Sequence, residues 1–197
     1  MKKPFVHHQL IVLLLALVLT ACAPIAVGPP PMPLPAGARG EVGLHNSVRL
    51  SQYPQELGPA IWFRRPTRGG NELYVLAGAA LGIEIFPFAG VGCRRYLVES
   101  NQGDSLSDRL DLGIELGAGA AWAHVAMPVS LRLGPSVWLT SQPSVGLNYF
   151  GLLHVPLGVS VRPREHVQVN AVVGSRLLSL LGNDPINYWN LGMSFRL

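Results

Sequence analysis

The chain has 197 residues, 49% of them hydrophobic and 13% charged, with a formal net charge of +4. It is too apolar for a disordered chain, carries few charges for an ordinary soluble surface, and is too evenly balanced in charge to indicate nucleic-acid binding. With 22 glycines and 17 prolines, it favours one domain of short strands and tight turns.

Residues 1–21 are predicted to be a signal peptide. Lys2 and Lys3 precede the apolar run LIVLLLALVL, which is shorter than the roughly 20 residues that a transmembrane helix needs. Residues 19–22, LTAC, resemble the lipobox of bacterial lipoproteins. This resemblance implies that the lipoprotein-processing machinery cleaves before Cys22 and acylates it, with palmitate as a typical chain. The alternative is a plain secretory signal in which Cys22 has no special role.

Ala23 follows the cysteine, at the place where an aspartate retains enterobacterial lipoproteins in the inner membrane. The resemblance therefore implies a lipid-anchored protein of the cell outer membrane. Residues 22–40 hold the lipidated cysteine and a proline-rich stretch. Because proline favours extended polyproline II, this stretch is interpreted as a semi-rigid linker between anchor and folded body. A proline-rich ligand for a partner protein is the alternative.

From Glu41 onward, apolar residues alternate with small or polar ones at a period of two, which predicts strands and no helices. We expect residues 41–197 to be an all-β domain of about eight to ten antiparallel strands. The pattern is clearest in residues 41–51, 72–86, 109–122 and 155–173, and weaker in residues 59–65, 89–98, 125–134 and 135–141. Residues 136–153 fit either one strand and a loop or two strands.

The polar face distinguishes two all-β architectures. A soluble β-sandwich needs many Lys, Glu, Thr and Asp residues on its outer face. This chain has no lysine after Lys3, and its polar face is mostly Gly, Ser, Arg and isolated acids. We therefore predict an up-and-down transmembrane β-barrel with apolar side chains toward lipid and small or polar ones in a narrow lumen. A lipid-tethered soluble β-sandwich or barrel facing the periplasm is the alternative.

Two further features belong to the barrel interpretation. With an even number of strands and both strand ends in the periplasm, the lipidated N-terminus would lie in the inner leaflet of the outer membrane. Aromatic residues near strand ends are expected to form the interfacial girdles of such a barrel. They are Trp62, Phe63, Trp138, Tyr149, Tyr188 and Trp189.

The chain ends in NLGMSFRL, which resembles the β-signal of outer-membrane barrel proteins. Asn190, Gly192, Phe195 and Leu197 occupy the places of that motif, although Leu197 replaces the commoner terminal Phe. The resemblance implies that the barrel-assembly machinery recognises this last strand.

Charged residues on the polar face are expected to pair with one another in a plug-like network, because an unpaired buried charge is unfavourable. A catalytic or conducting role is the alternative. The set comprises Glu41, Arg49, Glu72, Glu84, Arg94, Asp111, Glu115, Arg132, Arg162, Arg176 and Arg196.

His45 and Ser47 form an H-x-S pair on one strand face, similar to the base and nucleophile of outer-membrane lipid A deacylases. That family carries the pair near its C-terminal end with an acidic partner; here it lies on the first strand with no identifiable acid. We therefore expect no catalytic residue. Because Cys93 is the only cysteine besides Cys22 and the other histidines lack ligand spacing, we expect no cofactor or metal.

The resulting expectation is a lipid-anchored outer-membrane barrel with a structural, cell-envelope interaction or narrow-pore role. Its expected partners are membrane lipids, the lipoprotein-processing machinery, the barrel-assembly machinery and an envelope protein. The alternatives are a deacylase-like enzyme and a periplasm-facing tethered binding domain.

Overall fold

The structure is a computed structural model that describes residues 28–50, 57–81, 85–101, 105–119, 122–147, 153–177 and 186–197. The predicted signal peptide and Cys22 lie outside these residues, as do Glu84 and Tyr149. The boundaries proposed for the signal peptide and the lipidated cysteine therefore stay predictions.

In these described ranges, twelve strands form one antiparallel sheet. They are β1 (Glu41–Leu50), β2 (Leu57–Pro66), β3 (Asn71–Leu81), β4 (Ile85–Val98), β5 (Leu110–Gly119), β6 (Trp122–Ala126), β7 (Val129–Gly134), β8 (Val137–Ser141), β9 (Ser144–Leu147), β10 (Leu153–Arg164), β11 (Val167–Leu177) and β12 (Ile186–Arg196). A short 3₁₀ turn, η1 (Ser107–Arg109), precedes β5. Within the described ranges no helix is long and apolar enough to cross a membrane.

The twelve strands occupy ten positions around a closed barrel. Strands β6 and β7 follow one another along β5, and β8 and β9 follow one another along β10. Pro128 and Pro143 lie in the two interruptions, where a proline, having no N–H group, cannot donate to the ladder. Residues 136–153 thus supply two short strands that share one position, followed by the start of β10.

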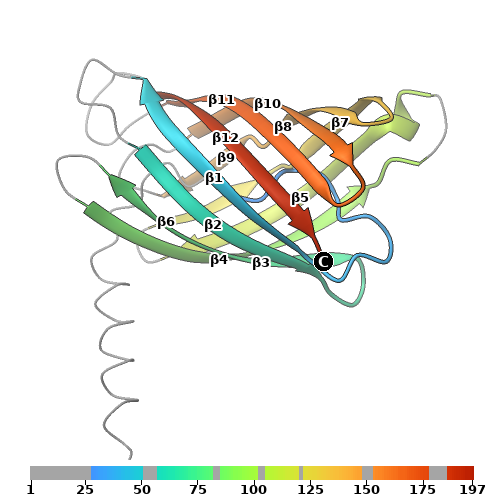
Figure 1. Cartoon of the computed structure of the whole chain (residues 1–197), viewed down its shortest axis with the longest axis horizontal. Helices are drawn as coiled ribbons and strands as arrows, with labels where there is room; N and C mark the ends of the chain where they lie inside the picture. Colours follow the sequence, from blue (N-terminus) through green and yellow to red (C-terminus); the bar gives the residue numbers. More distant parts are fainter. Residues whose placement is uncertain are drawn as a thin grey trace, which may run out of the picture.

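Pairing of the first strand with the last closes the barrel. The register runs from Glu41 opposite Arg196 to Leu50 opposite Asn187, and the strands follow one another in chain order around the ring (Figure 1). The predicted all-β, up-and-down topology is confirmed. Closure leaves no exposed sheet edge, which a bilayer would not tolerate. We call the end of the barrel that holds Glu41 and Arg196 the termini end, and the other the loop end.

Two segments that the pattern presents as continuous strands contain a hairpin. Residues 72–86 are divided between β3 and β4, and residues 109–122 between β5 and β6. Leu81 pairs with Ile85, and both point outward. The connection keeps the alternation in phase, so period-two patterning alone does not reveal the turn.

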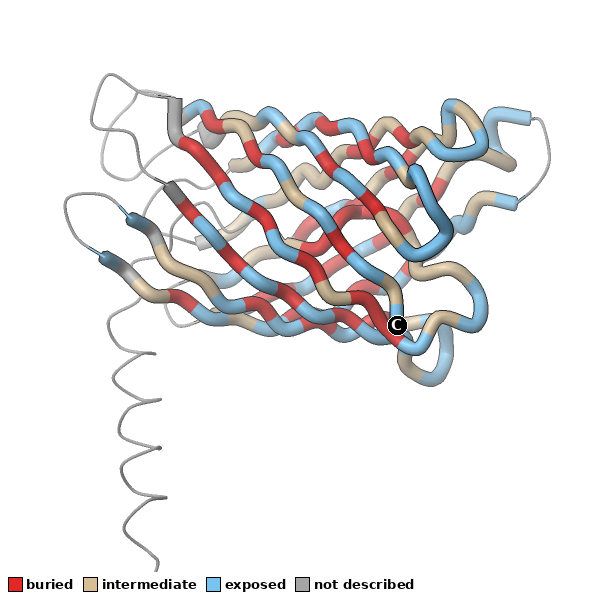
Figure 2. Tube along the Cα trace, viewed as in Figure 1, coloured by how far each residue is buried: buried red, intermediate tan, exposed pale blue. Residues whose placement is uncertain are grey.

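Burial alternates along most of the strands (Figure 2). Large apolar side chains face outward, among them Leu44, Val91 and Leu157, each more than half exposed. Polar and charged side chains face inward, such as Glu41, Ser47 and Asn190, which are buried. This is the inside-out distribution of a transmembrane barrel, with strands long enough to cross a bilayer when tilted. The soluble β-sandwich alternative is therefore wrong.

The aromatic girdle prediction fails for three of its residues, because Trp62, Trp138 and Tyr188 are buried inside the barrel. Phe63 and Trp189 do belong to outward-facing rows.

The inward rings lie across glycines on the neighbouring strand. A Cβ atom on Gly43 would come within 2.2 Å of the Trp62 ring, and one on Gly92 within 2.1 Å of the Tyr74 ring. Both are directly opposed pairs in the register. The inward glycines thus provide the space in which these rings lie against the wall, which explains why a narrow lumen needs them.

We predict that Gly92→Ala destabilises the barrel by about 1–3 kcal/mol, because the added methyl group displaces the buried Tyr74 ring. The measurement is urea unfolding in lipid vesicles, followed by tryptophan emission. Gly134→Ala is the matched control, since a Cβ atom at Gly134 meets nothing within 4 Å. Equal stability of the two variants would show that the ring-over-glycine contact has no structural importance.

Candidate functional site in the barrel lumen

The first described residues lie inside the barrel. We call residues 28–34 the lumenal segment; its residues Pro29 to Met32 are buried. The chain then turns at the termini end through residues 35–40, where Gly37 has a φ of 84°, and enters β1 (Figure 1). The interpretation of the proline-rich stretch as a linker outside the folded body is wrong for residues 28–34.

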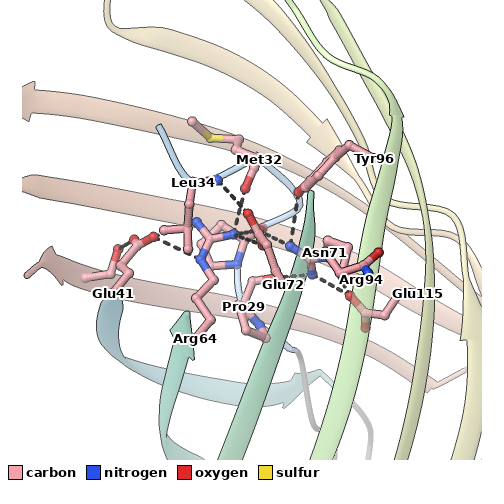
Figure 3. Close-up of polar contacts among 12 residues, drawn as sticks. Pro29, Met32, Leu34, Glu41, Arg64, Asn71, Glu72, Arg94, Tyr96 and Glu115 are labelled. Atoms are coloured by element: carbon pink, nitrogen blue, oxygen red, sulfur yellow. Dashed lines mark hydrogen bonds and ion pairs between the residues drawn. The ribbon is translucent and has the colours of Figure 1, made fainter. Parts of the chain in front are cut away.

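Arg64, on β2, joins the wall of the barrel to this segment (Figure 3). Its Nε and Nη2 donate to Oε2 of Glu41 at 2.9 and 2.5 Å. Its Nη1 donates to the carbonyl oxygen of Met32 at 2.6 Å and, at 3.2 Å each, to the carbonyl oxygen of Pro30 and Oε2 of Glu72. The guanidinium is 1% exposed, so these acceptors replace water.

Arg94, on β4, repeats the arrangement nearer the middle of the barrel. Its Nε and Nη2 lie 2.7 and 2.5 Å from Oε2 of Glu115. Its Nη1 donates to the carbonyl oxygen of Pro30 at 2.6 Å, and its Nη2 to that of Pro29 at 3.0 Å. The Pro30 carbonyl therefore bridges the two arginines, because it accepts hydrogen bonds from both.

The proline content of the segment matches this environment. Each proline offers a carbonyl acceptor and no N–H donor, so the run of prolines faces the guanidinium donors without adding donors that need partners. Leu34 supplies a backbone N–H, which donates to Oε1 of Glu72 at 2.6 Å. The carbonyl acceptors of the segment therefore face guanidinium donors on the wall, and its Leu34 N–H donor faces a carboxylate acceptor.

Glu115 is the most enclosed carboxylate among the residues that the structure describes, with a side chain that is 0% exposed. Besides Arg94 on Oε2, its Oε1 accepts hydrogen bonds from the Tyr74 hydroxyl at 2.8 Å and from Nε2 of Gln142 at 2.8 Å. Nε2 of His124 lies 2.9 Å from the same oxygen. Buried charge is tolerated here because the carboxylate is paired and hydrogen-bonded on both oxygens.

The predicted network of paired charges is confirmed where the structure describes it, for Glu41, Glu72, Arg94 and Glu115. Asp111 is also satisfied, by the Ser130 hydroxyl at 2.5 Å and the Ser100 N–H at 2.6 Å. The remaining arginines lie at the margins of the network or outside it. Arg162 stacks on the Trp138 ring at 4.7 Å, Arg132 donates to the carbonyl oxygen of Asn101, Arg196 is half-buried, and the side chains of Arg49 and Arg176 are outside the described residues.

Arg64 is the site residue that the sequence interpretation missed. It stands beside Arg65 in a strand with a weaker pattern, and only one of the two arginines faces inward. The available signal was the period-two alternation along this strand. Ile61 and Phe63 point outward, so the same alternation places Trp62 and Arg64 inside the barrel. The same alternation correctly places Arg94 inward and Arg95 outward.

His45 and Ser47 both face the lumen and are buried. Nε2 of His45 has no hydrogen-bond partner among the described residues, and Ser47 Oγ accepts a hydrogen bond from Nδ2 of Asn190 at 2.8 Å. The bond from a serine to the Nε2 of this histidine, which a hydrolytic pair could use, is therefore not formed.

Two of the histidines that lack metal-ligand spacing in the sequence have polar partners in the lumen. His124 contacts Glu115, as described above. His154 lies 3.3 Å from Ser144 Oγ through its Nδ1, and its Nε2 is hydrogen-bonded to the Tyr188 hydroxyl. In the described part of the chain, no group of three or more His, Cys, Asp or Glu residues is placed to hold a metal ion.

The residues of the C-terminal motif lie on both faces of the closing strand. Asn190 and Gly192 face inward, and a Cβ atom on Gly192 would lie 3.1 Å from His45. Phe195 and Leu197 are exposed on the outside. The backbone N–H of Leu197 donates to the carbonyl oxygen of Gly40 at 3.0 Å. The last residue is therefore held by pairing, while its role in assembly stays a prediction.

The fold and the lumen define a small transmembrane β-barrel whose interior is occupied by its own chain. No protein-family model matches the sequence, and no curated protein matches it. The solved structures that it resembles include the N-terminal β-barrel domain of OprF from Pseudomonas aeruginosa, with 10% identity over 80% of this chain and 96% of that one and a TM-score of 0.39. The KdgM porin in complex with oligogalacturonate has 5% identity over 80% and 99%, with a TM-score of 0.43. The attachment invasion locus protein Ail of Yersinia pestis has 13% identity over 80% and 96%, with a TM-score of 0.37.

We predict that Arg94→Met destabilises the barrel by about 3–5 kcal/mol, because it leaves the buried Glu115 carboxylate without its cationic partner. Arg95→Met is the matched control, since Arg95 is exposed on the outer face of the same strand. Urea unfolding in lipid vesicles measures both, and Arg95→Met should shift the midpoint little. If the two variants unfold together, the lumenal ion pair does not stabilise the fold.

Proposed function

We propose that this protein is a lipid-anchored β-barrel of the bacterial outer membrane whose lumen is closed at rest by its own lumenal segment. The observation that carries the proposal is the bridging of Arg64 and Arg94 by the Pro30 carbonyl. A chain held between Arg64 and Arg94 occupies the part of the lumen through which a solute would pass. The role we assign is structural, or interaction with other envelope components, and conduction through a narrow pore requires the segment to leave.

Location in the outer membrane is supported by three features of the chain. The barrel has an apolar outer surface, as expected for contact with lipid. The closing strand ends in a motif that resembles the β-signal, and the LTAC sequence resembles a lipobox. Membrane lipids, the lipoprotein-processing machinery and the barrel-assembly machinery are therefore the partners we propose.

We propose no enzymatic role. The His45 and Ser47 pair that resembles a lipid A deacylase lacks the hydrogen bond to Nε2 of His45 described above. The Ser47 hydroxyl is engaged with Asn190. The lumenal carboxylates nearest the segment are engaged by arginines rather than poised for proton transfer.

A protease site inserted between Ala36 and Gly37 tests closure of the lumen without disturbing folding, because both residues are exposed in the turn at the termini end. We predict that the uncut protein gives no conductance steps in a planar bilayer. Cleavage followed by a mild urea wash should release the lumenal segment from the arginines and produce discrete steps.

The same protease site inserted between Gly69 and Gly70, in the exposed turn after β2, is the control and should leave the cut barrel closed. Equal conductance before and after cleavage at Ala36 would contradict closure by the lumenal segment.

Lipid attachment is tested by growth with labelled palmitate. The full chain should incorporate the label and Cys22→Ala should not, while Cys93→Ala should label normally because Cys93 lies within the barrel wall. Unchanged labelling of Cys22→Ala, or absence of label from the full chain, would remove the lipid anchor from the proposal.

A further inference from the structure

The outer face of the barrel carries arginines near its termini end. Arg65 is the ninth of the ten residues of β2, and Arg95 is the eleventh of the fourteen residues of β4. Both are exposed and belong to the outward rows, next to Phe63 in the row on β2 and to Cys93 in the row on β4. In the loop-end half of the barrel, the described outward residues of the strands include no arginine or lysine.

Pairing of the strands brings these two arginines to the same edge of the apolar surface. Arg65 pairs with Leu73 of β3, and Arg95 pairs with Asn71, two residues nearer the start of that strand. One strand therefore separates the two guanidinium groups. We call Arg65 and Arg95 the outer arginines. Toward the loop end, the exposed side chains of Phe63 and Leu73 continue the apolar surface.

The barrel offers the outer arginines no counter-charge of its own. Neither has a hydrogen-bond or ion-pair partner among the described residues. The carboxylates of Glu41, Glu72 and Glu115 lie inside the wall, where the lumenal arginines engage them. A guanidinium group without a counter-charge at the boundary of a hydrocarbon layer is unfavourable. An anion outside the barrel is therefore expected at this edge.

The phosphate group of a phospholipid meets this requirement. It lies at the surface of the hydrocarbon layer, where the apolar band of a transmembrane barrel ends. Its oxygens match the forked donors of a guanidinium group, which binds phosphate in a bidentate manner. The long arginine side chain can cover apolar surface with its methylene groups while its charged end reaches the headgroup. An outward row on the strands faces lipid rather than solution, which favours a lipid over a free anion.

We propose that the outer arginines bind the phosphate groups of anionic phospholipids in the leaflet at the termini end of the barrel. This site goes beyond the proposed function, because it depends neither on lipidation of Cys22 nor on closure of the lumen. It requires only that the apolar outer face lies in a bilayer. With the strand ends in the periplasm, the leaflet is the inner leaflet of the outer membrane, and the contact fixes the depth at which the termini end is held.

The test uses the full chain, purified in a non-ionic detergent, and measures binding of single lipids by native mass spectrometry. Phosphatidylglycerol is the anionic probe, and phosphatidylcholine, which carries a phosphate but no net charge, is the reference. The unchanged protein should bind phosphatidylglycerol at least about tenfold more tightly, because each basic residue near an anionic lipid surface strengthens the attraction about fivefold. Raising the salt concentration should weaken this preference.

The double variant Arg65→Gln with Arg95→Gln should lose the preference, while Arg65→Lys with Arg95→Lys should keep most of it because the charges remain. The matched control is Arg68→Gln with Arg164→Gln. It removes the same charge from two exposed residues at the β2–β3 and β10–β11 turns of the termini end. It should retain the preference. Heat-modifiable migration in gels confirms that each variant is folded.

Four results would overturn the proposal. The unchanged protein could bind both lipids equally, or the Arg65→Gln, Arg95→Gln variant could keep the preference. Equal loss in the control variant would show a general effect of charge instead of a site. Displacement of phosphatidylglycerol by an equal concentration of inorganic phosphate would show a site for the free ion instead of the lipid.

Discussion

A guanidinium group removed from water needs an acceptor for each of its five N–H groups, and this constraint organises the lumen. Around Arg94, the wall contributes Glu115, the Tyr96 hydroxyl and Gln142. The carbonyl oxygens of Pro29 and Pro30 supply the rest. The wall alone leaves donors unsatisfied, which is unfavourable for a buried charge. The lumenal segment is thus part of the folded structure.

The wall makes space for that segment through its pairs of glycine and aromatic residues. Trp62 lies over Gly43, and Tyr74 lies over Gly92. Rings held against the wall in this way leave the axis of the barrel to the chain, and Tyr74 still reaches Glu115 with its hydroxyl. The inward glycines therefore make room for the aromatic rings. The rings, held against the wall, leave room for the lumenal segment.

The strand pattern made much of this structure predictable, but it could not reveal the contents of the lumen. Period-two alternation assigns Glu41, Glu72 and Glu115 to the inside, because every strand of a barrel has one face toward lipid. It does not reveal the hairpin near Leu81, since the turn keeps the alternation in phase. A proline-rich run has the same local pattern whether it lies in water or inside a barrel. Its contacts in the lumen join its own backbone carbonyls to arginines 32 to 65 positions away, and a carbonyl group is common to every residue.

The contacts of the lumenal segment also bear on the choice between a pore and a structural role. The segment is continuous with β1 through residues 35–40, and the carbonyl oxygens of Pro29, Pro30 and Met32 accept hydrogen bonds from Arg94 and Arg64. Withdrawal of the segment would leave buried guanidinium donors without acceptors, which is unfavourable. A barrel whose buried arginines depend on its own plug is better suited to a structural or envelope-interaction role than to constant solute passage.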